Sequence, residues 1–182
     1  MSATLESYRL TRFRLPLQRV IGDSQVRFEK IFVAALELRT QDGQVGLGFL
    51  NSFSLPPLTE MERLFENEVW SQLKDQSIHP LLHRLTRPRG GNIRSHLFEE
   101  ALDQALWDLY GKQVDLPLYR LLGGTNNRVR AYASGLDFHL TSAQLLDFFA
   151  HAVQQGYSAF KVKVGHSDLA WDVARLREVV SV

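Results

Sequence analysis

The chain has 182 residues, of which 45% are hydrophobic and 23% charged, and its formal net charge is +1. This composition is ordinary for a soluble globular protein, and the small net charge excludes a strong overall attraction to nucleic acid or to an anionic membrane. The absence of cysteine excludes disulfides and thiolate metal sites. The first residues lack the features of a signal peptide, and no apolar stretch is long enough to span a bilayer, so we expect a cytoplasmic protein.

The N-terminal segment predicts an antiparallel meander. Partial alternation over residues 8–15 indicates a first strand, which a polar loop over 16–28 separates from a strand rich in apolar residues over 30–40. An Asp-Gly turn at 42–43 then leads back into a strand over 45–50.

Helical spacing dominates the next part of the chain. Apolar residues recur with the helical period over 60–73, 78–85 and 95–110, and Gly111 is expected to close the third of these helices. A short helix should follow Pro117, because proline suits the first turn of a helix.

The rest of the chain predicts two βα units with parallel strands. A strand over 129–134 precedes a helix that opens on a Thr141-x-x-Gln144 capping box, and a strand over 159–164 precedes a helix from about residue 168. The last helix carries four apolar residues on one face: Leu169, Val173, Leu176 and Val180. A (β/α)8 barrel needs about 250 residues, so we expect these units to begin a larger fold.

Two lysines in the second of these strands are the most informative feature of the sequence. Side chains alternate along a strand, so Lys161 and Lys163 project from one face while Phe160, Val162 and Val164 cover the other. On a buried face, repulsion and desolvation would lower the pKa of an ammonium group, which suits a lysine to proton abstraction. The alternative is an edge strand whose lysines face water and discourage aggregation.

The barrel geometry distinguishes the roles of the two lysines. The outward face of a barrel strand packs on helices, so both lysines would point inward, near the carboxyl end where barrel active sites lie. Lys163 is closer to that end and is the candidate base, whereas Lys161 lies one layer deeper and would act as its electrostatic partner.

The segment 100–124 resembles the signature helix pair of the mandelate racemase and muconate lactonizing enzyme family of the enolase superfamily. It reads EALDQALWDLYGKQVDLPLYRLLGG, and the Lys-x-Lys strand follows about forty residues later, where the resemblance places it. The resemblance covers the whole chain. It implies an α+β capping domain over 1–125, an antiparallel meander plus helices, followed over 126–182 by the first two βα units of an incomplete (β/α)8 barrel.

The resemblance also implies a mechanism. Members of the superfamily remove the α-proton of a small carboxylate substrate with a lysine or histidine base, and Mg²⁺ stabilises the enediolate. The matching base is Lys163, with Lys161 as its partner. The Mg²⁺ ligands and the second acid/base group come from later strands, so we expect them beyond Val182 and can name no metal ligand here. The chain alone is expected to be inactive, and a homo-oligomer is expected.

Two loops of the capping domain are implied to contact substrate. The first contributes Ile21, Asp23 and Ser24, and the second contributes Asn51 and Phe53. Glycine and polar residues suit a mobile lid that excludes water. An ordinary solvated hairpin loop explains any single one of these residues equally well.

One departure from the family pattern bears on the reaction. Many members carry glutamate after the Gly-x-Gly of the third strand, whereas Gly46-Leu47-Gly48 is followed here by Phe49. This favours racemases or sugar-acid dehydratases over cycloisomerases.

Other polar residues give weaker signals. His139 and His166 follow the two barrel strands and are candidate contacts at the active-site mouth. A basic cluster surrounds Gly90-Gly91 and comprises Arg84, Arg87, Arg89 and Arg94. It lacks a phosphate-loop motif and interleaved aromatic residues, so a solvated turn is favoured over a nucleic-acid site.

Two hypotheses follow from the sequence. The first is the N-terminal portion of a Mg²⁺-dependent lyase or isomerase, with dehydration of a sugar acid or hydroxy acid as the first choice and racemisation or epimerisation as the second. The other hypothesis is a truncated, non-catalytic module for binding or assembly, favoured by the missing metal ligands and barrel strands.

Overall fold

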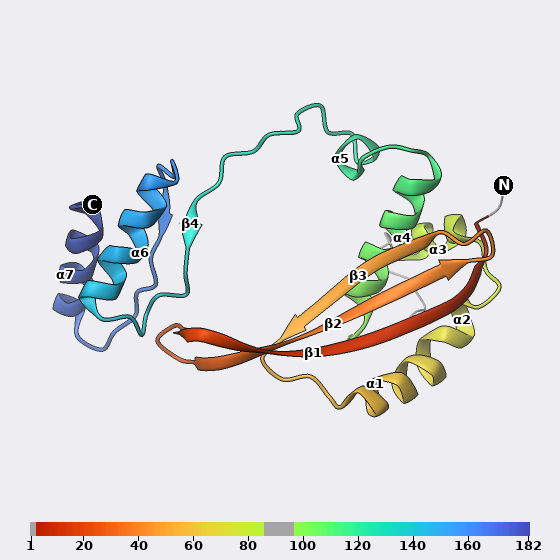
Figure 1. Ribbon diagram of the computed structural model, residues 1–182, viewed down its shortest axis with the longest axis horizontal. Coiled ribbons are helices and arrows are strands. Elements are labelled where there is room, and N and C mark those ends of the chain that lie inside the picture. Colours follow the sequence, from red (N-terminus) through yellow and green to blue (C-terminus); the bar gives the residue numbers. More distant parts are fainter. Residues whose placement is uncertain (1–2, 86–96) are drawn as a thin grey trace. The chain divides into compact units, whose positions relative to one another are not determined.

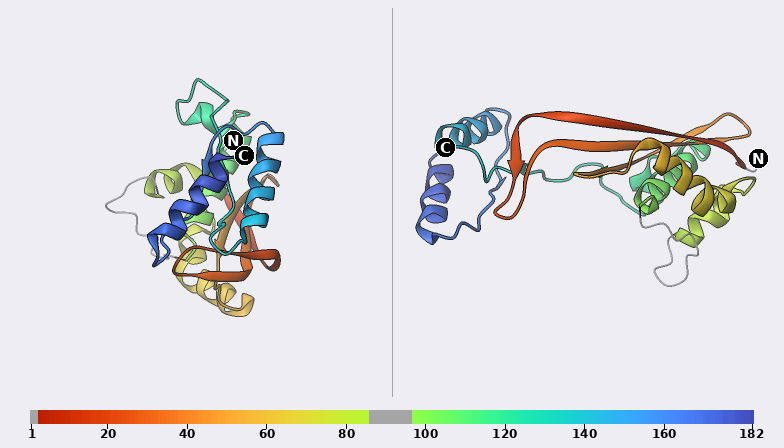
Figure 2. Two further views of the ribbon diagram at one scale, coloured as in Figure 1. Left: turned by 90° about the vertical axis from the view of Figure 1, so that its left-hand side faces the viewer. Right: turned by 90° about the horizontal axis from the view of Figure 1, so that it is seen from below.

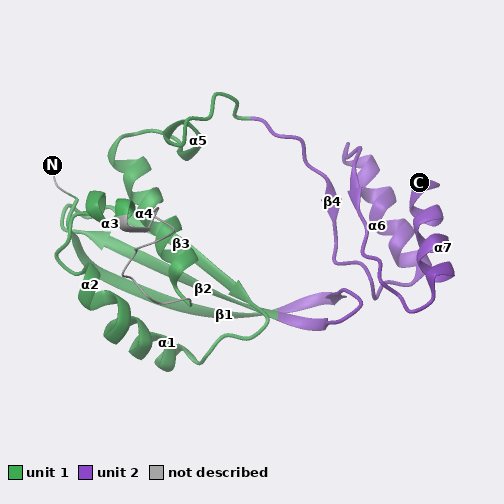
Figure 3. Cartoon of the chain, turned by 180° about the vertical axis from the view of Figure 1, so that it is seen from behind, with its two compact units in different colours: residues 1–15, 31–127 green, residues 16–30, 128–182 purple. Residues whose placement is uncertain are grey.

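The computed structural model describes residues 3–85 and 97–182. Its contacts divide the chain into two compact units, one formed by Met1–Leu15 and Ile31–Asn127 and the other by Pro16–Lys30 and Arg128–Val182 (Figure 3). Each unit has its own hydrophobic core.

A three-stranded antiparallel sheet opens the fold, as predicted (Figure 1). Its strands are β1 (Leu5–Gly22), β2 (Arg27–Thr40) and β3 (Val45–Ser52), in the order β1-β2-β3. The predicted loop over 16–28 is wrong, because β1 and β2 continue through most of it and only residues 23–26 form the turn. Pro16 is tolerated within β1 because β1 lies at the edge of the sheet, where a missing N–H costs no ladder hydrogen bond.

The helix α4 (Glu99–Gln113) packs closely on β3 through two glycines. A Cβ atom added to Gly48 would lie 1.8 Å from the carbonyl oxygen of Ala101, and one added to Gly46 would lie 2.2 Å from that of Ala105. The Gly-x-Gly sequence is therefore explained by a close approach of strand and helix backbones.

Side chains of α4 also bind the free edge of β3. Gln104 accepts a hydrogen bond from Phe49 N at 3.0 Å and donates one to Phe49 O at 3.1 Å. Asp108 accepts from Leu47 N at 2.8 Å, and Lys112 donates to the backbone oxygen of Val45 at 2.7 Å. The helix therefore covers a strand edge that would otherwise present unpaired backbone groups.

Replacing Gly48 by alanine should lower the free energy of unfolding by about 1–3 kcal/mol, because the added methyl group forces strand and helix apart. Urea denaturation would measure the change. The control is Leu47→Ala, which removes a side chain that is 40% exposed on the same strand. Equal stability of Gly48→Ala and the parent would contradict the close packing.

The remaining helices of the first unit enclose its core. They are α1 (Leu58–Leu64), the π-helical η1 (Phe65–Trp70), α2 (Ser71–Leu73), α3 (Ile78–Leu85) and α5 (Leu118–Leu121). Elements α1, η1 and α2 together occupy the helix predicted over 60–73. The largest fully buried side chains include Phe65, Phe98, Leu36, Met61 and Leu102.

The predicted end of α4 at Gly111 is wrong. The helix continues to Gln113, and Gly111 is buried inside it. Asp115 takes the left-handed conformation that ends the helix, with φ 51°. Leu116 N then donates to the carbonyl oxygen of Gly111 at 3.0 Å, the hydrogen bond expected of a Schellman motif.

The second unit holds the two βα units. The strands β4 (Ala133–Ser134) and β5 (Phe160–Lys161) pair in parallel, and the helices α6 (Ser142–Gln154) and α7 (Leu169–Val180) lie beside each other (Figures 1 and 2). Both strands are shorter than predicted, because the hydrogen bonding of two parallel strands without further neighbours is only weakly stable. The capping box of Thr141 and Gln144 is confirmed.

The predicted apolar face of α7 is exposed in the described chain. Leu169 is 74% exposed and Val180 is 86% exposed. The opposite face is buried and carries Asp172, Arg175 and Val179. The periodicity of apolar residues therefore predicted the wrong buried face, because two polar side chains, Asp172 and Arg175, determine how α7 packs. No helix in the described ranges is long and apolar enough to cross a membrane.

Candidate functional site

Lys161 ends β5 and Lys163 follows two residues later, both on the side opposite Phe160 and Val162, as the alternation predicts. Val164, in contrast, is 48% exposed and does not cover the face predicted for it. Phe160 and Val162 pack on the core that includes Phe149, and the rings of Phe149 and Phe160 are 5.1 Å apart. Lys161 and Lys163 therefore project from the opposite face of the chain. Lys161 is exposed and Lys163 is half-buried, because two strands do not enclose a barrel interior.

A buried carboxylate holds the backbone at Lys163. Lys163 N donates to both oxygens of Asp137 at 3.3 Å, and the Asp137 side chain is fully buried after β4. The carboxylate in turn pairs with Arg175 of α7, at 3.7 Å between Nη2 and Oδ2. This connects the ends of both strands to the second helix.

Arg175 is itself buried, and both of its terminal nitrogens donate within this region. Its Nη1 donates to the carbonyl oxygen of Leu140 at 3.0 Å, and its Nη2 donates to the backbone oxygen of Asp137. Burial lowers the pKa of the Arg175 guanidinium, and the carboxylates of Asp137, Glu178 and Asp172 oppose that shift. Neither Asp137 nor Arg175 was predicted as a site residue, although Asp172 and Arg175 share a helix face, three residues apart.

The loop after β5 is held by a second buried carboxylate. Asp172 Oδ2 accepts from Gly165 N at 2.9 Å and from His166 N at 3.1 Å. The ring of His166 stacks on Trp171 at 4.6 Å between centroids, and its Nδ1 accepts from Asp168 N at 3.0 Å. In the neutral ring this bond places the proton on Nε2, which can donate to a ligand.

The tip of the β1–β2 hairpin docks on the ends of both barrel strands within the second unit. Gly22 N donates to the carbonyl oxygen of Leu136 at 3.0 Å, and His139 Nε2 lies 3.0 Å from the carbonyl oxygen of Val26. A Cβ atom added to Gly165 would lie 2.8 Å from Ser24 Oγ. The tip therefore contacts the segment after β4 and the loop after β5.

The predicted residues of the first loop lie at this tip, where Ser24 is beside Gly165, two residues after Lys163. Ile21 is half-buried near the end of β1, and Asp23 and Ser24 follow it. Asp23 Oδ1 accepts from Gln25 N at 2.9 Å and from Val26 N at 3.2 Å, which forms an Asx turn.

The Asp23 carboxylate is held in its ionised form. Its pKa lies below the ordinary value, chiefly because the Gln25 N–H stabilises the charge. Partial desolvation opposes the shift, while the Val26 N–H and the nearby Lys163 and His139 contribute to it. The carboxylate is therefore negative at neutral pH and lies within electrostatic range of the candidate base.

The second predicted loop belongs to the other unit. Asn51 pairs in register with Val33 at the end of β3, and Phe53 follows with 41% of its surface exposed. The assignment of Asn51 and Phe53 as substrate contacts stays a prediction. Of the basic cluster, the side chain of Arg84 and the residues Arg87, Arg89 and Arg94 lie outside the described residues.

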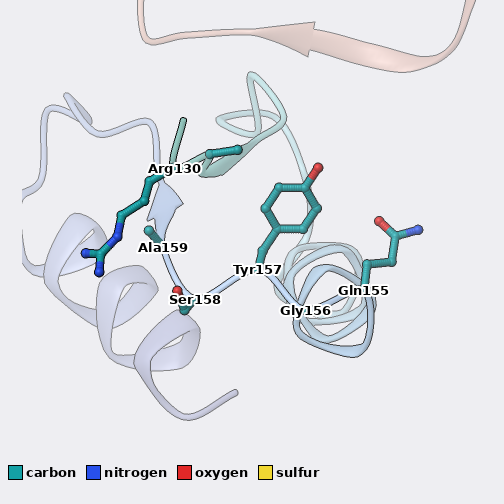
Figure 4. Close-up of a pocket in the computed structure, with 7 residues that line it drawn as sticks. Arg130, Gln155, Gly156, Tyr157, Ser158 and Ala159 are labelled. Carbon is teal, nitrogen blue, oxygen red and sulfur yellow. The ribbon is translucent and has the colours of Figure 1, made fainter. Parts of the chain in front are cut away.

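An open pocket of about 670 Å³ lies at the other end of the two strands (Figure 4). It is lined by residues that precede β4 and β5, including Arg130, Tyr157 and Ser158. Barrel chemistry uses the carboxyl ends of the strands, so this pocket is not the candidate active site.

Comparison with known proteins decides the family. Residues 12–123, more than half of the chain, match the family described as mandelate racemase / muconate lactonizing enzyme, N-terminal domain. The chain belongs to this family. The resemblance of segment 100–124 and the predicted fold class are thereby confirmed.

Curated relatives are about 30% identical in sequence to the chain where the two align. Arabinonate dehydratase of Saccharolobus solfataricus is 27% identical, over 82% of the chain and 42% of its own length. The 3,6-anhydro-alpha-L-galactonate cycloisomerase of Streptomyces coelicolor is 31% identical, over 94% of the chain and 49% of its own length. The chain therefore spans about half the length of the curated relatives that it matches.

Solved structures of family members share the fold. A protein from Mesorhizobium loti, provisionally described as a mandelate racemase, is 50% identical with a TM-score of 0.90, and the match covers 98% of the chain and 47% of that protein. A racemase from Streptomyces coelicolor with bound magnesium is 27% identical with a TM-score of 0.81, and the match covers 97% and 51%.

The carboxylates near the candidate base do not form a magnesium site. Groups of three or more histidines or acidic residues that could hold a metal do not occur in the described part of this family member. Asp137 is paired with Arg175, and Asp172 Oδ2 accepts from two backbone N–H groups. The residues present therefore do not fit a Mg²⁺ centre of the kind that hard oxygen ligands build.

Proposed function

We propose that the chain supplies the general base of an enzyme that removes the α-proton of a small hydroxy acid or sugar acid. The single observation that carries this proposal is the position of Lys163. It lies just after β5 on the side opposite the core-packed Phe160 and Val162, its backbone N–H is anchored by Asp137, and the hairpin tip contacts Gly165 two residues further on. Lys161 is proposed as its electrostatic partner.

Dehydration is the reaction that we propose first. Lys163 Nζ takes the proton from the α-carbon, the electron pair left behind forms a carbon–carbon double bond, and the β-hydroxyl leaves as water with a proton from a general acid, either the Lys163 ammonium just formed or the second acid/base group of the complete enzyme. The resulting enol becomes a 2-oxo-3-deoxy acid. The family includes curated dehydratases of sugar acids, such as arabinonate dehydratase, which supports this choice.

Racemisation or epimerisation is the second candidate. It begins with the same proton removal but returns a proton to the opposite face of the α-carbon, which requires a second acid outside this chain. The structural likeness to a protein provisionally described as a mandelate racemase supports it.

Three further features stay predictions from the sequence. They are the domain boundary at residue 125, self-association and a cytoplasmic location.

The proposed function is tested by α-proton exchange in heavy water. The complete protein would be incubated with a panel of hydroxy acids and sugar acids, and NMR would follow the α-hydrogen and any 2-oxo product. We expect exchange with at least one acid, accompanied by a carbonyl product for a dehydratase and by the epimer for a racemase. Failure to exchange any acid of the panel would contradict the proposal.

Removal of divalent metal should abolish this exchange. We expect EDTA to stop the reaction of the complete protein and added Mg²⁺ to restore it, since a relative of 27% identity was solved with bound magnesium. Undiminished exchange after exhaustive chelation, checked by metal analysis of the protein, would overturn the assignment of Mg²⁺.

A further inference from the structure

The tip of the β1–β2 hairpin places the negative charge of Asp23 at the carboxyl ends of β4 and β5, the mouth of the candidate site. Gly22, Ser24 and Val26 fix the tip against Leu136, Gly165 and His139, and Asp23 lies between the first two of these contacts. The contacts come from both ends of a tight turn. The backbone that carries Asp23 is therefore held in place and is not a free loop.

The carboxylate of Asp23 is oriented by its own turn. Both backbone hydrogen bonds go to Oδ1, which leaves Oδ2 without a hydrogen-bond partner among the described residues. An ionised oxygen in this position accepts hydrogen bonds from hydroxyl groups and repels other anions. Because Asp23 is only half-buried, a ligand can reach it.

Two neighbouring guanidinium groups, those of Arg19 and Arg175, are held by contacts within the second unit, although Nη1 of Arg19 is buried without a hydrogen-bond partner among the described residues. Arg19 donates to the carbonyl oxygen of Gly135 at 3.1 Å and lies over the ring of Phe148. Arg175 is buried with Asp137. Lys163 lies within electrostatic range of Asp23, and the proposed function assigns this lysine to the α-proton.

We propose that Asp23 makes the enzyme select sugar acids with one carboxylate and a terminal hydroxyl (aldonic acids) over the corresponding diacids (aldaric acids). This inference rests on the proposed function, because it assumes that the α-carbon of the substrate lies at Lys163. The distal end of the substrate then extends beneath the hairpin tip. A hydroxyl group there donates to Asp23, whereas a second carboxylate meets a fixed negative charge.

Matched substrate pairs test the inference. Galactonate and galactarate differ only in the last carbon, which is a hydroxymethyl group in one and a carboxylate in the other, and gluconate and glucarate form a second pair. The complete protein is expected to show a higher kcat/KM for the monoacid of any pair that it uses. Asp23→Asn keeps the oxygen that accepts the two backbone bonds and removes the charge, so it should shift the ratio toward the diacid by about tenfold.

Two further variants keep the result interpretable. Asp23→Ser also removes the charge and retains a turn-forming oxygen, so it should shift the ratio in the same direction. Asp147→Asn removes an exposed carboxylate from α6 and should leave the ratio unchanged. Thermal unfolding of each variant would verify that the fold is retained.

The outcomes separate this inference from the proposed function. Exchange or turnover with an unchanged ratio in Asp23→Asn and Asp23→Ser would overturn the inference and leave the proposed function standing. Preference of the parent protein for the diacids would also overturn it. Complete absence of α-proton exchange with all four acids and with the wider panel would overturn both.

Discussion

Replacing Asp137 by alanine is expected to lower the free energy of unfolding of the second unit by about 3–5 kcal/mol, because it leaves a buried guanidinium without its counter-charge. Arg175 is 4% exposed and Asp137 is fully buried. The same change removes the acceptor for Lys163 N. Urea denaturation of the complete protein, followed by a probe in the second unit such as Trp171 fluorescence, would measure the loss.

A double-mutant cycle separates the free energy of the Asp137–Arg175 interaction from other effects of the substitutions on stability. In a background of Arg175→Ala, the further change Asp137→Ala should cost much less than it does in the parent, since the two groups are coupled. The exposed Asp147→Ala on α6 is the matched control and should change stability by less than about 0.5 kcal/mol. Additive effects of Asp137→Ala and Arg175→Ala would contradict the coupling.

Replacing Lys163 by alanine should lower turnover of the complete enzyme by about 10²–10⁴-fold, the range that a positioned general base contributes. Its side chain is the proposed acceptor of the α-proton. Because the backbone anchor at Lys163 N does not depend on the side chain, the variant should keep its fold. A fall in kcat with little change in KM is therefore expected.

Comparison with other lysines tests whether the effect is specific. Lys161→Ala should reduce turnover less than Lys163→Ala, because Lys161 acts only through its charge. Lys74→Ala removes an exposed lysine of the first unit and should leave turnover unchanged. A larger loss in Lys161→Ala than in Lys163→Ala would reverse the assignment of base and partner.

Much of this fold was predictable from short sequence patterns, because the structures that these patterns indicate depend on residues close together in the chain. The capping box of Thr141 and Gln144 and the alternation of Phe160 and Val162 around Lys161 depend on residues only a few positions apart. The antiparallel meander was predicted for the same reason. The family resemblance depends on the segment 100–124, whose helix does pack on β3 as a unit.

The missed features depend on contacts between distant residues. The strand β1 continues past Pro16 because an edge strand tolerates proline, which only the order of the sheet reveals. The end of α4 is an exception, because Asp115 ends the helix through hydrogen bonds between residues only a few positions apart. Arg175 is buried because Asp137, thirty-eight residues earlier, lies against it. Of the candidate site, the lysine face and the gathering of Asp23 and Ser24 with the lysine strand were foreseeable, whereas the carboxylates that anchor the loops were not.

Deuterium exchange at the α-carbon tests the role of Lys163 without requiring the later steps of the reaction. The complete protein and its Lys163→Ala variant would be incubated with an accepted acid in heavy water, and NMR would follow the α-hydrogen signal. We expect exchange in the parent and none above the uncatalysed background in the variant. Exchange in Lys163→Ala at the rate of the parent would show that another group is the base.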